Sequence, residues 1–218
     1  ADDRYLPHVP CTFAQLAKFG RTSATVTLVV PATTSRDLRV GVEIAASRHG
    51  IGLDVVPVTE LDNLYARGLV HDYQYISHHT YSKLILAEVL PHLDEVLYLD
   101  IDTLIRAPLD DLLAWKLHHP VGAVADLVGG LHLFGTAQQP YFNAGVLRMS
   151  LERMRREGTW DQARQLLEAQ RGLILQDQDV LNLLFRDRFD SLPIGFNVFD
   201  SVAEKSSWLP VLRDPLIV

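Results

Sequence analysis

Two aspartates, Asp100 and Asp102, follow a short apolar run and are separated by one isoleucine. In an extended chain, residues two apart point to the same side, so we expect both carboxylates to face one way and Ile101 to face the core. Two unpaired carboxylates this close repel each other, and a divalent cation with oxygen ligands removes the repulsion. The pair therefore predicts a cation site, although solvated loop acids and helix caps give the same pattern.

The apolar run before this pair gives the site its expected position. Val96, Leu97 and Leu99 are typical of a central parallel strand that is covered on both faces. Open α/β sheets bind their ligands at the carboxyl ends of such strands. We therefore expect a metal that holds a phosphate-bearing substrate at this edge.

The rest of the chain alternates helical and strand patterns, which favours an α/β fold with a mainly parallel central sheet flanked by helices. Residues 62–78 lack a clear period and are expected to form a loop. We read residues 1–218 as a single domain. Further strands are expected at 25–30, 53–58, 121–125 and 142–147, and helices at 8–19, 35–49, 79–90, 109–115, 159–170, 180–185 and from 151.

Composition excludes several classes of protein. The 218 residues carry a formal net charge of −7 and no dense block of lysine and arginine, which argues against nucleic acid as the main partner. Cys11 is the single cysteine, so a reducing, cytoplasmic compartment is expected. No apolar run is long enough to span a bilayer. No strand precedes Asp2, and the chain ends within an apolar run at 215–218, so we expect the sequence to be truncated at both ends. Peripheral membrane contact through the missing termini is compatible with this expectation.

Four blocks in order resemble glycosyltransferase family 8, the retaining transferases that include lipopolysaccharide galactosyl- and glucosyltransferases and glycogenin. The first is the opening loop, and the second is the run around Asp100 and Asp102. The third resembles the family's Phe-Asn-Ala-Gly block, and the fourth its Asp-Gln-Asp helix start. The blocks read ADDRY at 1–5, LYLDIDTL at 97–104, YFNAGVL at 141–147 and QDQDVLN at 176–182.

The resemblance implies a Rossmann-like GT-A fold that binds a UDP-sugar with Mn²⁺, or with Mg²⁺ as the alternative. Asp100 and Asp102 would be the metal ligands, and the metal would act as a Lewis acid toward the diphosphate. Asp177 would bind sugar hydroxyls, and Gln178 would lie near the reacting face as the second catalytic residue. The remaining donor-binding candidates, beside the two metal ligands, are Asp2, Tyr5, Lys83, Ile101, Asp126, Asn143, Ala144 and Gly145.

Two features depart from the family pattern. Arg4 stands where the family usually has Asn, and an arginine cannot both donate and accept as an amide does. The family also supplies a third metal ligand, a histidine, from a His-x-x-Gly block near the end of the catalytic domain, and this chain has no such block. The histidines that the chain does have, His78 and His79 among them, are expected at the surface or at a pocket rim.

The function that the resemblance implies is metal-dependent transfer of a hexose, glucose or galactose, from a UDP-sugar to a saccharide or other hydroxyl acceptor. A nucleotide-sugar-binding domain with little or no catalysis is the alternative. A phosphatase of the haloacid dehalogenase type fits less well. There the hydroxyl residue follows the second aspartate by two positions, whereas Thr103 follows Asp102 at once.

Overall fold

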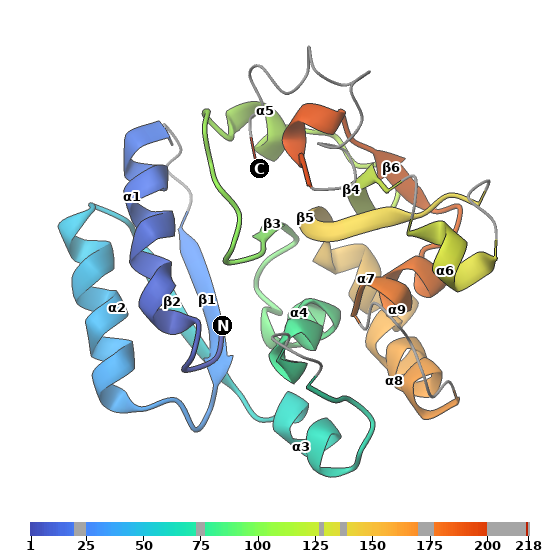
Figure 1. The fold of residues 1–218 in the computed structure, drawn as a ribbon, viewed down its shortest axis with the longest axis horizontal. Helices are drawn as coiled ribbons and strands as arrows, with labels where there is room; N and C mark the ends of the chain where they lie inside the picture. Colours follow the sequence, from blue (N-terminus) through green and yellow to red (C-terminus); the bar gives the residue numbers. More distant parts are fainter. Residues whose placement is uncertain are drawn as a thin grey trace.

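The computed structural model of the protein describes residues 1–19, 25–72, 77–126, 129–135, 139–169, 177–199 and 217. Within them the strands form a parallel pair, β1–β2, and a four-stranded sheet in the order β3-β5-β4-β6. Helices lie on both sides of this arrangement (Figure 1). The expected α/β class is therefore confirmed.

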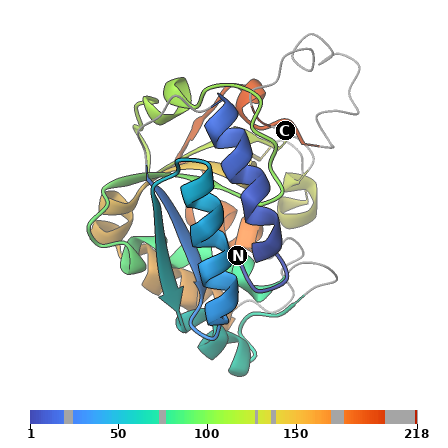
Figure 2. The same ribbon diagram turned by 90° about the vertical axis from the view of Figure 1, so that its left-hand side faces the viewer.

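The first layer joins β1 (Val26–Pro31) and β2 (Leu53–Val58), which run parallel. Helices α1 (Val9–Phe19) and α2 (Arg36–Arg48) lie side by side across this pair (Figure 2). Ser35 caps α2, because its hydroxyl accepts a hydrogen bond from the Leu38 N–H at 3.3 Å. Both expected helices and both expected strands are confirmed here, with ends that shift by at most one residue.

The larger sheet contains β3 (Glu95–Leu99), β4 (Val121–Ala125), β5 (Phe142–Ser150) and β6 (Phe189–Ser191). β4 and β6 are parallel, whereas β5 runs antiparallel to both β3 and β4. The reason is local: Ala125 at the end of β4 pairs with Phe142 at the start of β5. The chain thus enters β5 from the edge at which β4 ends, as in a hairpin. The expectation of a central parallel strand before Asp100 is wrong, because β3 lies at the edge of this sheet beside an antiparallel neighbour.

Four helices cover one side of this sheet: α4 (Ser82–Val89), α7 (Leu151–Glu157), α8 (Thr159–Ala169) and α9 (Asp177–Leu184). Their apolar side chains and those of β5 form the largest hydrophobic cluster, which includes Leu84, Leu147 and Leu181. α4 is buried over most of its length, so this helix is fixed between the sheet and its neighbours.

Several short elements escaped the sequence patterns. α3 (Glu60–Ala66) occupies part of the expected loop at 62–78, and it is anchored by Leu61 and Leu64, which are fully buried. A helix of seven residues is too short to show a clear period. The other short elements are η1 (Leu6–His8), η2 (His78–Tyr81), α5 (Asp110–Leu113), α6 (Gly130–Phe134) and η3 (Ile194–Phe196). No helix in the described ranges is both long and apolar enough to cross a membrane.

Asn182 on α9 fastens this helix to the start of β5. Its Oδ1 accepts from the Phe142 N–H at 2.8 Å, and its Nδ2 donates to the Phe142 carbonyl at 2.9 Å. The side chain is 1% exposed, so water does not replace either bond easily.

We predict that Asn182→Ala lowers the free energy of unfolding by about 2–4 kcal/mol, because it leaves two buried backbone groups unpaired. Urea unfolding followed by circular dichroism measures the change, with the exposed Gln165→Ala as the control. A loss no greater than that of the control would show that Asn182 does not fasten α9 to β5.

Candidate active site

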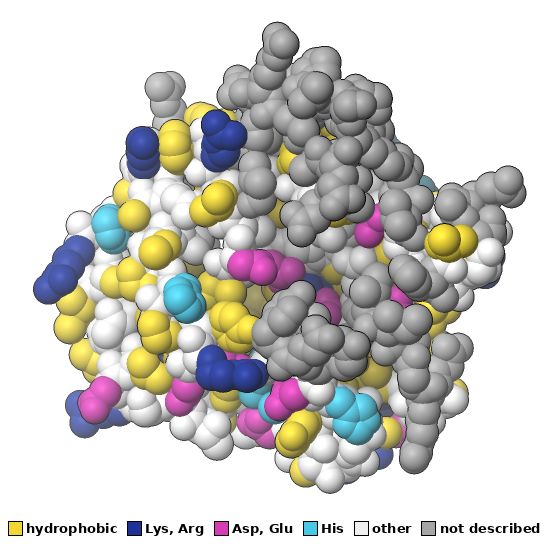
Figure 3. All heavy atoms as spheres, viewed as in Figure 1, with side chains coloured by type: hydrophobic (Ala, Val, Ile, Leu, Met, Phe, Trp, Pro, Cys, Tyr) yellow, Lys and Arg dark blue, Asp and Glu magenta, His cyan; other side chains and the backbone are white. Residues whose placement is uncertain are grey.

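One cavity of about 1240 Å³ opens between the two sheets. The edges of β1 and β3 line its apolar part, with Leu28 and Leu97 among the side chains. Its polar part lies where β3 ends, β5 begins and α9 begins. The space-filling view shows acidic side chains at the mouth of this hollow (Figure 3). Eleven of the twelve candidate residues named from the sequence line this cavity, and Asp126 does not.

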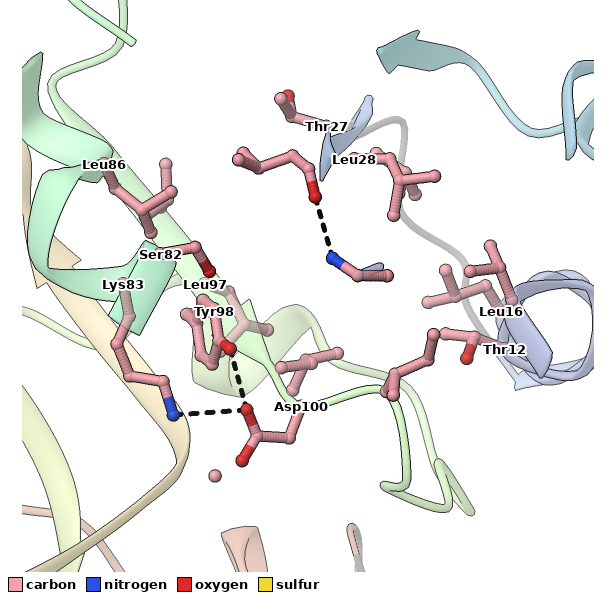
Figure 4. Close-up of a pocket in the computed structure, with 18 of the residues that line it drawn as sticks. Thr12, Leu16, Thr27, Leu28, Ser82, Lys83, Leu86, Leu97, Tyr98 and Asp100 are labelled. Carbon is pink, nitrogen blue, oxygen red and sulfur yellow. Dashed lines mark hydrogen bonds and ion pairs between the residues drawn. The ribbon is translucent and has the colours of Figure 1, made fainter. Parts of the chain in front are cut away.

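Lys83 is the centre of the polar part. It lies in the first turn of α4, and its side chain is 1% exposed. Its Nζ lies 2.6 Å from Asp177 Oδ2 and 3.2 Å from Asp100 Oδ1, and it donates to the Ala144 carbonyl at 3.1 Å. Burial lowers the pKa of Lys83, but the two carboxylates outweigh burial and raise that pKa well above its usual value. A permanent ammonium therefore joins α4, the end of β3, β5 and α9. Figure 4 shows its contact with Asp100.

Asp177 is the buried partner of this ammonium. Its Oδ1 accepts from the Thr80 hydroxyl at 2.9 Å, and its Oδ2 pairs with Lys83. Burial raises the pKa of Asp177, and Asp100 adds to the rise, while Lys83 and Thr80 oppose it. A carboxylate held on both oxygens is pre-positioned, and here it borders the cavity.

Asp100 and Asp102 lie in a turn after β3, not in extended chain as expected. The turn closes because the Asp100 carbonyl accepts from the Thr103 hydroxyl at 2.8 Å and from its N–H at 3.3 Å. Both carboxylates nevertheless border the same cavity, and Ile101 packs against the cluster of α1 and α2. Partial burial and the charge of Asp100 raise the pKa of Asp102.

This pair has the features that an oxygen-ligated cation requires. Asp100 Oδ1 accepts from Lys83 and, at 2.7 Å, from the Tyr98 hydroxyl, while no hydrogen bond from the described residues occupies Oδ2. A Cβ on Gly145 would lie 3.4 Å from that oxygen, so the glycine keeps the space beside it open. A divalent cation would also neutralise the charge that raises the pKa of Asp102. The residues present therefore fit the expected metal.

The start of β5 presents an ordered polar edge to the cavity. Asn143 Oδ1 accepts from the Gly145 N–H at 2.9 Å and from Asn197 Nδ2 at 2.8 Å. Gln178 Oε1 accepts from the Ala144 N–H at 2.9 Å, and its Nε2 donates to the Tyr141 hydroxyl at 3.3 Å. Ala144 contributes through its backbone alone, with its N–H on Gln178 and its carbonyl on Lys83.

The opening loop forms another wall of the cavity. Asp2 Oδ1 accepts from the Arg4 and Tyr5 N–H groups at 3.0 and 3.3 Å, which shapes the turn that leads into η1. Burial raises the pKa of Asp2, but hydrogen bonds from Ser77 and Arg4 outweigh burial and lower it overall. Arg4 pairs with Asp2 at 3.5 Å, and Tyr5 borders the cavity.

Asp126 is the candidate that the structure places elsewhere. It follows β4, and its Oδ1 accepts from the Gly129 N–H at 3.0 Å. This is the role of a turn acid, and Asp126 does not border the cavity that the other candidates share. Its part in binding a sugar stays a prediction.

The sequence patterns missed three side chains that hold the candidates in place. Tyr98 lies on β3, two residues before Asp100 in the following turn, and its hydroxyl donates to that carboxylate at 2.7 Å. Thr80 lies one helical turn before Lys83, which places it near the same carboxylate, Asp177. Asn197 comes from a distant segment, and no local signal connects it to Asn143.

Comparisons with known proteins agree on one family. The family model described as glycosyl transferase family 8 matches residues 1–218. A probable glycosyl transferase of Streptococcus gordonii is 32% identical over 63% of the chain and 21% of its own length. A putative glycosyltransferase of Haemophilus influenzae is 25% identical over 70% of the chain and 48% of its own length. The chain thus spans less than half the length of these curated relatives.

Among solved structures, the galactosyltransferase LgtC in complex with donor and acceptor sugar analogues is 25% identical, with a TM-score of 0.77. The match covers 100% of this chain and 84% of LgtC. An active-site mutant of LgtC, with glutamine replaced by glutamate, matches equally well. These neighbours are GT-A glycosyltransferases, and the GT-A fold expected from the sequence is confirmed.

We predict that Lys83→Met destabilises the fold by about 3–5 kcal/mol near neutral pH, because two carboxylates lose their buried cation. The change removes a group that holds the pKa of Asp177 down, so the folded-state pKa rises further above the unfolded value. A carboxyl group with a raised folded-state pKa costs more stability as pH rises. The deficit should therefore be larger at about pH 8 than at about pH 5.

Urea unfolding at both pH values measures this difference. Lys116→Met, at an exposed position, is the matched control, and Lys83→Met combined with Asp177→Asn should regain part of the lost stability. A deficit that is the same at both pH values would contradict the pairing of Lys83 with the two carboxylates.

Proposed function

The chain belongs to glycosyl transferase family 8, and we propose that it transfers a hexose, glucose or galactose, from a UDP-sugar to a saccharide or other hydroxyl acceptor. We propose that the reaction depends on a metal and retains the configuration of the sugar. One observation carries the proposal: ten of the twelve candidate residues come from four separate sequence blocks, Lys83 and Asp126 lie outside them, and eleven of the twelve border one cavity.

The donor's nucleotide would lie along the wall that carries Asp2, Tyr5 and Lys83. The Asp2 carboxylate has a lowered pKa and is therefore a ready acceptor for an N–H of the uracil ring. Tyr5 offers a ring against which uracil can pack. The cation of Lys83 lies beside the acidic pair and adds positive charge where the diphosphate would bind.

Asp100 and Asp102 would hold Mn²⁺, or Mg²⁺, through their carboxylate oxygens. When bound, the cation supplies Lewis-acid stabilisation of the negative charge on the leaving diphosphate. The protein's own contribution is to fix Asp100 through Tyr98 and Lys83, so that Oδ2 stays directed at the cavity. Gly145 keeps the neighbouring space free of a side chain.

The hexose would lie between the start of β5 and the start of α9. In the transfer, the bond from the anomeric carbon to the diphosphate oxygen breaks and the bond to the acceptor oxygen forms. The acceptor's proton passes to the leaving diphosphate. Asn143 and Asp177 would bind sugar hydroxyls, and Gln178 would orient the reacting face of the sugar. LgtC also has a glutamine in its active site, which supports a role for Gln178.

The acceptor class and the location of the enzyme are further parts of this proposal. LgtC has been solved with an acceptor sugar analogue, which supports a carbohydrate acceptor for this chain. A cytoplasmic location stays a prediction that rests on the single cysteine, Cys11, which is a free, exposed thiol. The single-domain interpretation of residues 1–218 likewise stays a prediction.

Two assays test the proposal together. Calorimetric titration with UDP, with and without Mn²⁺, should give metal-dependent binding near micromolar, about −8 kcal/mol. Release of UDP from UDP-glucose and UDP-galactose should then increase when a panel of saccharide acceptors is added. Metal-dependent binding without any turnover would instead support the alternative, a nucleotide-sugar-binding domain. Absence of UDP binding would contradict both functions.

We predict that Asp102→Ala weakens UDP binding in the presence of Mn²⁺ by at least about 100-fold, or 2.8 kcal/mol, because the cation loses a ligand. Asp102 is exposed at the cavity mouth, so the unfolding midpoint should stay close to that of the unchanged protein. Asp37→Ala, which removes an exposed aspartate from α2, is the control. Unchanged manganese dependence in Asp102→Ala would remove this residue from the metal site.

We predict that Gln178→Ala lowers kcat by about 100-fold or more while the Kd for UDP changes less than about threefold. Gln178 lies at the sugar end of the cavity, so its loss should affect the reaction and not the nucleotide. Steady-state kinetics and calorimetry on the same preparation separate the two effects, with the exposed Gln165→Ala as control. A turnover equal to that of the control would exclude Gln178 from the reaction.

A further inference from the structure

A second cluster of ligating side chains lies apart from Lys83, where α3 meets η2. It consists of Asp62, His78 and His79. Among the described residues, no other set of three such side chains brings its ligand atoms within 4.8 Å of one another. Of the two expected positions, surface or pocket rim, the structure supports the rim: the two side chains are only 12% and 10% exposed, both line a small pocket, and His79 also lines the large cavity.

The distances in this cluster match a tetrahedral metal site. Asp62 Oδ1 lies 3.3 Å from His78 Nε2 and 3.3 Å from His79 Nε2. Two ligands at about 2.05 Å from a tetrahedral zinc ion lie about 3.3–3.4 Å apart. The Asp62 contact does not satisfy His79 as a hydrogen bond would, because its Nε2 is buried without a hydrogen-bond partner. A nearly buried imidazole nitrogen thus points at a carboxylate oxygen without bonding to it.

The other nitrogen of each imidazole is already held. His78 Nδ1 lies 3.0 Å from Asp72 Oδ1, and His79 Nδ1 lies 3.2 Å from Ser77 Oγ. Metal-bound histidines nearly always hold their second ring nitrogen in this way, which fixes the ring and its tautomer. Tyr65 stacks on the His78 ring at 4.3 Å and restrains it further. Both Nε2 atoms lie 3.3 Å from the same Asp62 oxygen. The contact from His78 Nε2 has hydrogen-bond geometry, whereas that from His79 Nε2 does not.

We propose that Asp62, His78 and His79 form a zinc site, with water or another small ligand in the fourth position. Imidazole nitrogen suits Zn²⁺, whereas Mg²⁺ and Ca²⁺ prefer oxygen ligands alone. The site is distinct from the acidic pair at Asp100 and Asp102. It would join α3 to η2, and η2 leads directly into the helix that carries Lys83.

The site also touches the nucleotide wall of the cavity. Ser77, which holds the His79 ring, donates a hydrogen bond to Asp2. Thr80, the residue after His79, holds Asp177. A metal bound here would thus stabilise the segment that positions two of the candidate site residues, which assigns it a structural role.

Zinc titration of the untagged, chelator-treated chain tests the proposal. We would use an Asp102→Ala background, so that the acidic pair does not contribute, and measure binding by competition with a chromophoric chelator. One Zn²⁺ per chain is expected. Asp62→Asn should weaken binding by at least about 100-fold, and Asp72→Asn, which only loosens the His78 ring, by about 10–100-fold.

Two variants keep the test decisive. His79→Ala should abolish zinc binding, but it leaves a cavity at a buried position and can also disturb the fold. Asp62→Asn is therefore the primary variant, because the Asp62 side chain is 36% exposed. His92 is exposed and lies outside the proposed zinc site. His92→Ala should therefore leave the Kd for Zn²⁺ within about twofold of that of the background. Zinc binding that is absent in the background, or that is equal in Asp62→Asn, would overturn the proposal.

Discussion

The polar end of the cavity depends on the buried ammonium group of Lys83. Lys83 Nζ is enclosed by Asp177, Asp100 and the Ala144 carbonyl, and removing such a charge from water is tolerable only with partners of this kind. Each partner belongs to a different element. Because α9, the end of β3 and the start of β5 all meet at one ammonium, the polar end of the cavity has a defined shape before any ligand binds.

The hydrogen bonds around this ion pair extend the same constraint. Gln178 is hydrogen-bonded to the backbone of β5, and Asn182 joins α9 to Phe142. The Tyr98 hydroxyl donates a hydrogen bond to the Asp100 carboxylate. Side chains held in this way lose little freedom when a substrate arrives, which is the physical content of a preorganised site. The two proposed cation sites then differ by ligand chemistry: carboxylate oxygen beside Lys83, and imidazole nitrogen beside α3.

The sequence predicted the parts of this site that local patterns encode. The run before Asp100 is apolar and short, so it indicated a strand, and the alternation around it indicated the α/β class. The motif blocks identified most of the candidate residues that border the cavity, because the residues of each block are adjacent in the sequence and can be recognised together as one pattern. Asp126 shows the limit, since a turn acid and a sugar ligand have the same local sequence.

What the sequence could not show depends on contacts between distant segments. The direction of β5 follows from its pairing with the end of β4, and the burial of His78 and His79 follows from packing against α3. α3 itself is too short to show a period. Asp100 and Asp102 were expected in extended chain but lie in a turn, because the Thr103 hydroxyl donates to the Asp100 carbonyl. A threonine at this position does not by itself predict that hydrogen bond.

The most direct test of the central claim is a crystal structure of the protein with UDP and Mn²⁺, with anomalous scattering used to locate the manganese. We predict an anomalous peak between the carboxylates of Asp100 and Asp102, with the diphosphate beside it and the uracil near Asp2 and Tyr5. A nucleotide bound outside this cavity, or a manganese peak elsewhere with none at the acidic pair, would contradict the account.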